Sequence, residues 1–145
     1  MKWPCACLLL AAACSALPKD ADSTLERVRA EHRFALGIVA PGAGGDLQRR
    51  QAAFLALVAR ETGARPVTRQ GPLEPLLLDL EEGRLDMVIG AVASDSPWRT
   101  RVAVVEPLAE PGEDQPVIFA PMARNGENAW VMLIERHARA VREGR

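Results

Sequence analysis

The order of apolar and polar residues predicts strands and helices that alternate along the chain. Residues 34–39 and 85–92 are continuous apolar runs, which are typical of strands buried on both faces of a parallel sheet. Between these runs the leucines recur at helical spacing and form an apolar stripe at Leu73, Leu76, Leu77 and Leu80. The last predicted helix, from Glu127 onward, has one apolar face made of Trp130, Leu133, Ile134, His137 and Val141.

The predicted elements come in the order helix–strand three times, then two strands, then a final helix. Asp46 is placed to cap the second helix, Ser23 or Thr24 is placed to cap the first, and Gly83 ends the third. Residues 65–69 are polar for a strand and fit the edge of a sheet. We therefore predict an α/β protein, a three-layer α/β/α sandwich around a mainly parallel sheet of about five strands.

The stretch 77–108 carries the strongest functional signal. It predicts a helix, a buried strand, a polar loop at 94–99 and a second strand that stops before Pro107. In open α/β sheets, ligands usually bind outside the carboxyl ends of the strands, so this loop is the leading candidate site. Arg99 suits a carboxylate, because a guanidinium donates two parallel charge-assisted hydrogen bonds. Spacing alone leaves an ordinary surface arginine as the alternative.

This stretch resembles the amino-acid-binding family of bacterial periplasmic solute-binding proteins, which serve ABC uptake systems. That family has a helix ending in a basic residue, then Asp, apolar residues and a Ser/Thr–x–Thr–x–x–Arg loop. The matching residues here are Arg84, Asp86, Met87, Val88, Ile89, Ser94, Ser96 and Arg99. Residues 24–39 are similar to the opening helix and strand of the family, and residues 116–141 to its returning strand and closing helix.

The resemblance implies one lobe of a type II periplasmic-binding-protein fold, because the second lobe of the family has no counterpart in this chain. It implies that Arg99 pairs with the carboxylate of a ligand and that Ser94 and Ser96 supply hydroxyl groups. Trp98 would either stack on the ligand or anchor a partner protein. In place of the ring-bearing segment that covers the ligand in the family, this chain has a glycine turn at 41–45, so we expect weak binding.

Composition excludes several other functions. The chain has 18 basic and 19 acidic residues and a net charge of −1, which argues against nucleic-acid binding. Aromatic residues make up 4% and tyrosine is absent, so few rings could stack on sugars or bases. His32 and His137 lie far apart and no cysteine follows residue 14, so we predict no metal and no cofactor. Asp86 fits a structural position better than an acid–base pair with Asp95, and we predict no enzyme activity.

The N-terminus reads as an export signal. One lysine, a short apolar run and small residues precede Cys14, which is typical of a secretory leader. Residues 11–14 resemble a bacterial lipoprotein cleavage box, and this predicts a leader over 1–14 with lipid attached to Cys14. An ordinary signal peptide cut near residue 13 or 16 and a misplaced start codon are the alternatives. Residues 15–22 would then form a solvated tether and residues 23–145 a single lobe.

Two functions follow from these observations. The first is a periplasmic or membrane-tethered solute-binding protein of a transport system, which binds a small carboxylate such as an amino acid and works with an envelope transporter or other membrane protein. The alternative is a non-catalytic accessory or interaction protein built on one lobe, with a homodimer as one way to rebuild a two-lobed cleft. The first function requires an unpaired Arg99, and the second predicts an apolar surface in its place.

Overall fold

The computed structural model describes residues 20–39, 45–109 and 116–145. Its helices are α1 (Thr24–Glu31), α2 (Gly45–Thr62), α3 (Leu73–Glu81) and α4 (Asn128–Arg142), with the short 3₁₀-helix η1 (Pro97–Thr100). Its strands are β1 (Arg33–Val39), β2 (Arg65–Gly71), β3 (Met87–Ala93), β4 (Val102–Val104) and β5 (Val117–Arg124). The predicted alternation of helices and strands is confirmed.

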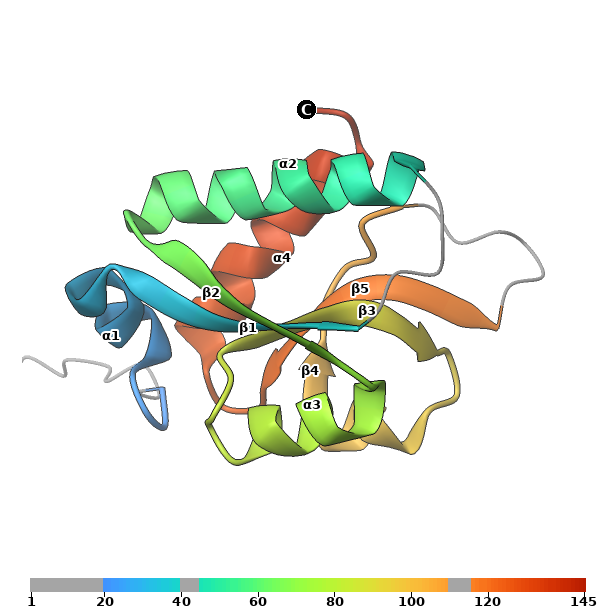
Figure 1. Ribbon diagram of the computed structural model, residues 1–145, viewed down its shortest axis with the longest axis horizontal. Coiled ribbons are helices and arrows are strands. Elements are labelled where there is room, and N and C mark those ends of the chain that lie inside the picture. The colour runs from blue at the N-terminus through green and yellow to red at the C-terminus, as the bar shows by residue number, and fades with distance from the viewer. Residues whose placement is uncertain (1–19, 40–44, 110–115) are drawn as a thin grey trace, which may run out of the picture.

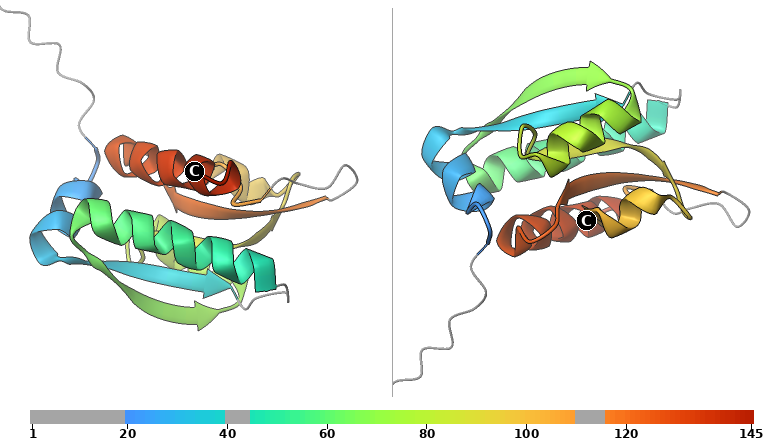
Figure 2. Two further views of the ribbon diagram at one scale, coloured as in Figure 1. Left: turned by 90° about the horizontal axis from the view of Figure 1, so that it is seen from above. Right: turned by 90° about the horizontal axis from the view of Figure 1, so that it is seen from below.

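The strands form one sheet in the order β2-β1-β3-β5-β4. β1 is parallel to β2 and β3, whereas β5 is antiparallel to both β3 and β4. Four of these five strands therefore point the same way. Helices α2 and α4 cover one face and α3 covers the other (Figures 1 and 2). The predicted α/β/α sandwich with a mainly parallel sheet is confirmed.

The alternation of side chains along β1 divides the core into two layers. Phe34 and Leu36 point toward α2 and α4, where they join Phe54 and Trp130 in one buried cluster. The rings of Phe34 and Trp130 lie 5.8 Å apart between centroids, with their planes tilted by 59°. The second cluster, on the opposite face, is formed mainly by α3, β3 and their neighbours; its buried members are Leu76, Leu77, Leu80, Leu85, Val88, Val92, Val102 and Met122.

Strand β2 lies at the edge of the sheet, as its polar sequence predicts. The backbone N–H of Arg65 donates to the carbonyl of His32, so alternate residues from Arg65 onward direct their backbone polar groups toward β1. Pro66 therefore faces outward, where its missing N–H costs no ladder hydrogen bond. A proline and exposed arginines on an edge strand discourage pairing with another chain.

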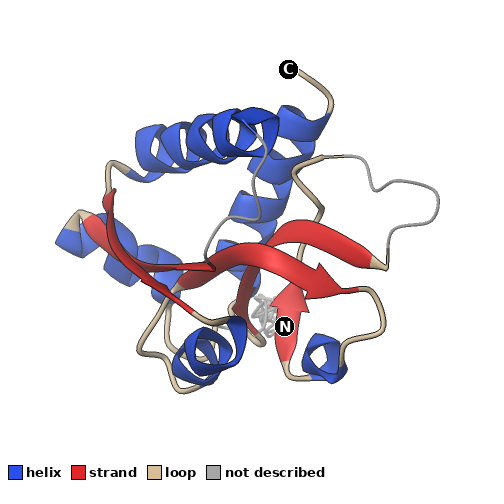
Figure 3. Cartoon of the chain, turned by 45° about the vertical axis from the view of Figure 1, so that its right-hand side comes forward, coloured by secondary structure: helices blue, strands red, loops and turns tan. Residues whose placement is uncertain are grey.

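The two ends of the sheet carry different parts of the chain (Figure 3). The carboxyl ends of β1 and β3 lie at one end, where α2 begins, and α1 and the β5–α4 turn lie at the other. A strand of seven residues such as β3 spans roughly 23 Å. The glycine turn at 41–45 falls almost wholly outside the described residues. Among the helices that the structure describes, none has the length and apolar character needed to cross a membrane.

Gly90 allows β1 and β3 to approach closely at their carboxyl ends. A Cβ at this position would lie 2.5 Å from Cβ and Cγ2 of Val39, a contact that neither backbone can relieve easily. We expect Gly90→Ala to lower the free energy of unfolding by about 1–3 kcal/mol, measured by urea denaturation. Gly71→Ala is the matched strand control, because its Cβ would meet Leu76 at an ordinary 3.7 Å. Equal effects of the two substitutions would contradict the close approach.

Candidate functional site

The 94–99 loop follows the carboxyl end of β3 directly. The N–H of Ser94 donates to the carbonyl of Pro116 at 2.7 Å, and the N–H of Ser96 donates to that of Ala93 at 3.1 Å. The hydroxyl of Ser96 accepts a hydrogen bond from the N–H of Trp98 at 3.3 Å and so caps η1. The two serines thus lie in one tight turn, and the hydroxyl of Ser96 has a structural partner.

The loop then runs back along the sheet and does not stay at its carboxyl end. Val88 of β3 and Val104 of β4 both pair with Met122, which places Val102 level with Asp86 at the amino end of β3. Arg99 comes three residues before Val102. The structure therefore separates Arg99 from Ser94 along the sheet, whereas the sequence predicts a compact group.

Arg99 is exposed, and its side chain makes no hydrogen bond or ion pair with any other described residue. Its neighbour Arg101 differs, because Nε of Arg101 donates to Oε1 of Glu81 at 3.1 Å. Ser94 and Asp95 are also exposed. The guanidinium of Arg99 is therefore available to an anion from solution, as the first predicted function requires.

Trp98 packs against the core cluster beneath α3. The guanidinium of Arg101 lies 4.2 Å from the centroid of its ring, within the range of a cation–π contact. Arg101 is in turn paired with Glu81, at the end of α3. The ring thus fixes η1 to the domain, and only the part left uncovered by Arg101 and the core remains available to a ligand.

Asp46 lies in the first turn of α2, which begins at Gly45, and does not precede the helix as a cap would. Its carboxylate accepts hydrogen bonds from Arg50 Nε at 2.8 Å and Arg49 Nη2 at 3.2 Å. The hydrogen bond from Arg50 holds the pKa of Asp46 below its ordinary value. The carboxylate thus favours the helix start through its charge.

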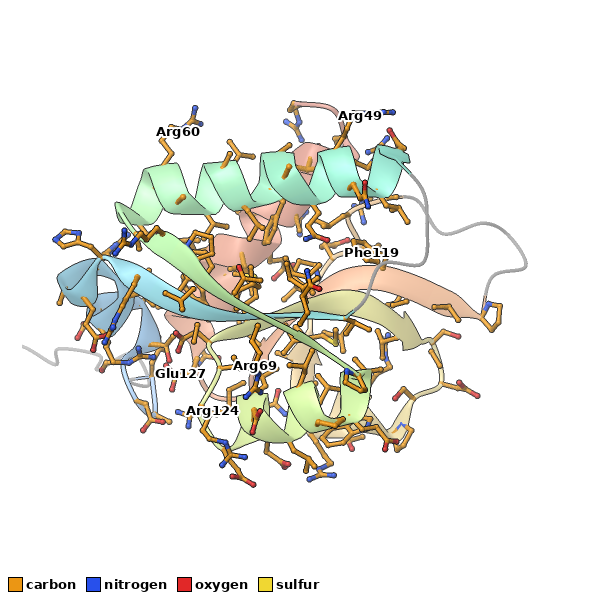
Figure 4. All side chains as sticks on the ribbon, in the orientation of Figure 1. Arg49, Arg60, Arg69, Phe119, Arg124 and Glu127 are labelled. Atoms are coloured by element: carbon orange, nitrogen blue, oxygen red, sulfur yellow. The ribbon has the colours of Figure 1, made fainter. Side chains whose placement is uncertain are left out.

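A second polar region, which the sequence did not predict, lies at the opposite end of the sheet. It is a cavity of about 280 Å³ between α1, the start of β3, the end of β5 and α4. Two arginines and three acids line it: Arg27, Arg124, Asp22, Asp86 and Glu127. Arg124 and Glu127 lie side by side there (Figure 4).

Glu127 is 1% exposed and its carboxylate is the hydrogen-bond acceptor for a distant part of the chain. It accepts from the N–H of Asp22 at 2.7 Å, the N–H of Thr24 at 2.8 Å and Nη2 of Arg124 at 3.1 Å. Burial alone would raise the pKa of Glu127, but the hydrogen bonds from Thr24 and Arg124 outweigh it and hold the pKa below 4.5. The predicted N-cap, Ser23, makes no side-chain cap hydrogen bond.

Asp86 occupies the structural position that the sequence indicates. Its Oδ2 accepts from the N–H of Ala35 at 2.8 Å and its Oδ1 pairs with Arg27. Its backbone carbonyl accepts from the indole N–H of Trp130 at 2.8 Å. The hydrogen bond to Asp86 raises the pKa of Arg27, although burial opposes it. These bonds occupy Asp86 within the fold.

The histidines do not assemble a metal site. His32 Nδ1 lies 3.2 Å from the carbonyl of Gly63, and His137 Nε2 lies 2.7 Å from Oε2 of Glu61. Within residues 20–39, 45–109 and 116–145, no group of three His, Cys, Asp or Glu side chains is arranged to hold a metal ion.

Solved structures with a similar fold are amino-acid-binding proteins. The arginine-bound form of domain 1 from TmArgBP superimposes with a TM-score of 0.63 at 14% identity, covering 78% of this chain and 96% of that chain. The chain has the fold of a single solute-binding-protein domain. No protein-family model matches this chain, and no curated protein matches it either.

Two further solved structures support this solute-binding-protein fold. An amino acid ABC transporter substrate-binding protein from Streptococcus pneumoniae, bound to L-arginine, gives a TM-score of 0.64 at 7% identity, covering 83% of this chain and 92% of that one. An ancestral cationic amino acid solute binding protein gives 0.60 at 9% identity, covering 83% and 94%. All three are binding proteins, and their likeness to this chain establishes its fold.

Trp98 and Arg99 should differ in their effect on stability. We expect Trp98→Ala to lower the free energy of unfolding by about 1–3 kcal/mol, because it removes packing under η1 and the contact with Arg101. Arg99→Ala should change it by less than about 0.5 kcal/mol, because the side chain is exposed and unpaired among the described residues. Urea denaturation measures both, and a large loss in Arg99→Ala would show that this arginine has a structural partner.

Glu127 should make stability depend on pH. Its pKa is lower in the folded state, so its contribution is present above the ordinary value of 4.5 and is lost as the pH falls through the folded value. We expect Glu127→Gln to cost about 1–3 kcal/mol at pH 7, with a smaller difference from the parent in acid. Thermal unfolding between pH 7 and pH 3 measures this, with the exposed Glu26→Gln as control. A difference that stays constant over this range would refute the assignment.

Proposed function

We propose that this chain is a single-domain solute-binding protein of a transport system, which binds a small carboxylate such as an amino acid. The solute-binding-protein fold supports the class, and the amino-acid ligands of the similar solved structures support the kind of solute. The proposed ligand-binding residues are Ser94, Ser96, Trp98 and Arg99.

The guanidinium of Arg99, which is exposed and has no partner among the described residues, carries this proposal. A ligand carboxylate would bind Arg99, and the hydroxyl of Ser94, at the carboxyl end of β3, would contact a different polar group of the ligand. Because Arg99 and Ser94 are separated along the sheet, the ligand contacts are spread over the loop. Trp98 contributes only through the uncovered part of its ring.

Binding by one domain should be weak. A salt bridge to an exposed arginine in water contributes about 0–1 kcal/mol, because solvent screens it. A ligand bound by one domain alone would stay partly exposed to water. We therefore propose dissociation constants in the millimolar range.

The remaining parts of the proposal concern location and domain organisation. The leader over 1–14 and lipid attachment at Cys14 lie outside the described residues and remain predictions, as does the domain division at residues 15–22 and 23–145. A periplasmic location and the lack of enzyme activity accord with the similar binding proteins.

The alternative function, an accessory or interaction protein, has one observation in its favour. Met132 of α4 is 68% exposed and borders an open groove of about 590 Å³. The other large exposed apolar residues lie on separate elements: Val67 on β2, Leu78 on α3 and Val117 on β5. None of these apolar residues lies in the 94–99 loop, so the exposed Arg99 favours the first function.

Thermal unfolding with ligands tests the proposal. L-Arginine and other amino acids at about 10 mM should raise Tm by a few degrees, since a ligand at ten times a dissociation constant of about 1 mM adds about 1.4 kcal/mol. Agmatine, which is arginine without the carboxylate, should give a smaller shift. Arg99→Ala should abolish the difference between arginine and agmatine.

Arg60→Ala is the matched control, because Arg60 is an exposed arginine on α2 that points away from the sheet (Figure 4). Its ligand-induced shift should equal that of the parent chain. A normal melt with no shift for any amino acid would overturn the proposal and favour the interaction function.

A further inference from the structure

Residues 20–24 and 124–129 hold each other by exchanging helix caps. The carboxylate of Asp20 accepts from the N–H of Ala129 at 3.0 and 3.1 Å, in the first turn of α4. The carboxylate of Glu127 accepts from the N–H groups of Asp22 and Thr24, where α1 begins. We call this arrangement of residues 20–24 and 124–129 the clasp. It provides acceptors for N–H groups that a helix start leaves unpaired.

Further contacts support the clasp. The N–H of Ala21 donates to the carbonyl of Gly126 at 3.4 Å, and Asp22 forms an ion pair with Arg124. Ser23 adopts a left-handed backbone with φ of 51°, which is uncommon for a serine. This conformation allows the N–H groups on either side of Ser23 to reach the same carboxylate, as in an anion-binding nest. The surrounding hydrogen bonds offset its cost.

The clasp changes the role of the predicted tether. The sequence places Asp20 and Asp22 in a solvated linker, but both contact the domain. Asp20 contacts the first turn of α4, and Asp22 contacts Arg124 at the end of β5. The buried carboxylate of Glu127 is part of the attachment, and charge-assisted hydrogen bonds of this kind are stronger than neutral ones. The chain is therefore fixed to the domain from Asp20 onward.

The clasp lies at the amino end of the sheet. Asp22 and Glu127 line the same cavity as Gly83, Leu85 and Asp86, which immediately precede β3. The carboxyl ends of β1 and β3, with Ser94 and the first turn of α2, lie at the other end, roughly 23 Å away along β3. The views of Figure 2 show these two ends on opposite sides of the domain.

We propose that the clasp orients the domain relative to whatever its N-terminal segment is attached to. An attached chain would hold its clasp end near the attachment and present the carboxyl end of the sheet to solution. Ser94 and the start of α2 would then face away from the attachment. The proposal rests on attachment through residues 1–19, which belongs to the proposed function.

The short segment between Cys14 and Asp20 limits how far the domain can move from its attachment. Cys14 and Asp20 are six residues apart, and a chain of that length spans at most roughly 20 Å. If residues 20–23 came loose as well, the reach would grow and the domain could turn more freely. The clasp thus limits both the distance and the range of orientations.

The chain's own composition provides the experiment. All three cysteines lie in the first 14 residues, so a full chain with Cys5→Ser and Cys7→Ser can be coupled through Cys14 alone to maleimide-bearing phosphatidylcholine vesicles. Its only lysines, Lys2 and Lys19, can be replaced by arginine, which leaves the N-terminal amine as a constant background. Single reporters are then made as Arg60→Lys or Arg49→Lys, labelled with an amine-reactive donor dye before coupling.

These two reporters form a matched pair on α2. Both replace an exposed arginine by lysine, and Figure 4 shows them at opposite ends of the helix. Arg60 lies near the clasp end and Arg49 near the carboxyl end of the sheet. With an acceptor dye in the lipid, energy transfer should be greater from residue 60 than from residue 49. Equal transfer from both, or greater transfer from residue 49, would overturn the proposal.

Breaking the clasp completes the test. Asp20→Asn with Glu127→Gln should reduce the difference between the two reporters, and Glu26→Gln should leave it unchanged. Where the double variant lacks a cooperative thermal melt, Asp20→Asn alone is used, because its bond to Ala129 is exposed. A difference that persists after the clasp is broken would also overturn the proposal. Chemical coupling makes the result independent of ligand binding and of lipid attachment at Cys14.

Discussion

Asp86 joins four elements of the fold, α1, β1, β3 and α4, through its carboxylate and its backbone N–H and carbonyl groups. Its N–H donates to the carbonyl of Ala35, and its Oδ2 accepts from the N–H of Ala35. These bonds join the two segments one residue before the first ladder pair of β1 and β3, Leu36 and Met87. Its other carboxylate oxygen pairs with Arg27 of α1, and its carbonyl accepts from Trp130 of α4. A buried carboxylate is tolerated here because each of its oxygens has a partner.

The same physical constraint explains the neighbouring clasp. Glu127, like Asp86, is a buried acid whose burial is offset by donors from other parts of the chain. Together these acids connect α1, β1, β3 and α4 at the amino end of the sheet. The carboxyl end has a separate network, in which Arg50 of α2 donates to the carbonyls of Leu108 and Val141. Glu106 pairs there with Arg139 and Arg142 of α4. Both ends of the sheet are thus held by polar contacts, and loops positioned by such a rigid scaffold commonly bind ligands.

The candidate binding loop depends on this scaffold in a specific way. Ser94 is held at the carboxyl end of β3, while Trp98 and Arg101 hold η1 against α3. Arg99, between these two anchored residues, is left exposed. An arginine that has no partner on a well-anchored turn is preorganised, since only its own side chain must be ordered when an anion binds. The burial of Trp98 therefore supports the proposed role of Arg99.

The sequence determined the elements and the fold class. The apolar runs of β1 and β3 and the leucine stripe of α3 are local periodic signals, and burial on two faces of a sheet follows from them. The loop at 94–99 and the structural position of Asp86 were also visible in the sequence.

Only the tertiary structure decided that β4 starts at the amino end of the sheet, which separates Arg99 from Ser94. It alone revealed Glu127 as the cap of α1, because the two are more than 100 residues apart. Hydrogen bonds between distant segments leave no periodic trace in a sequence, so such pairings become known only once the chain has folded.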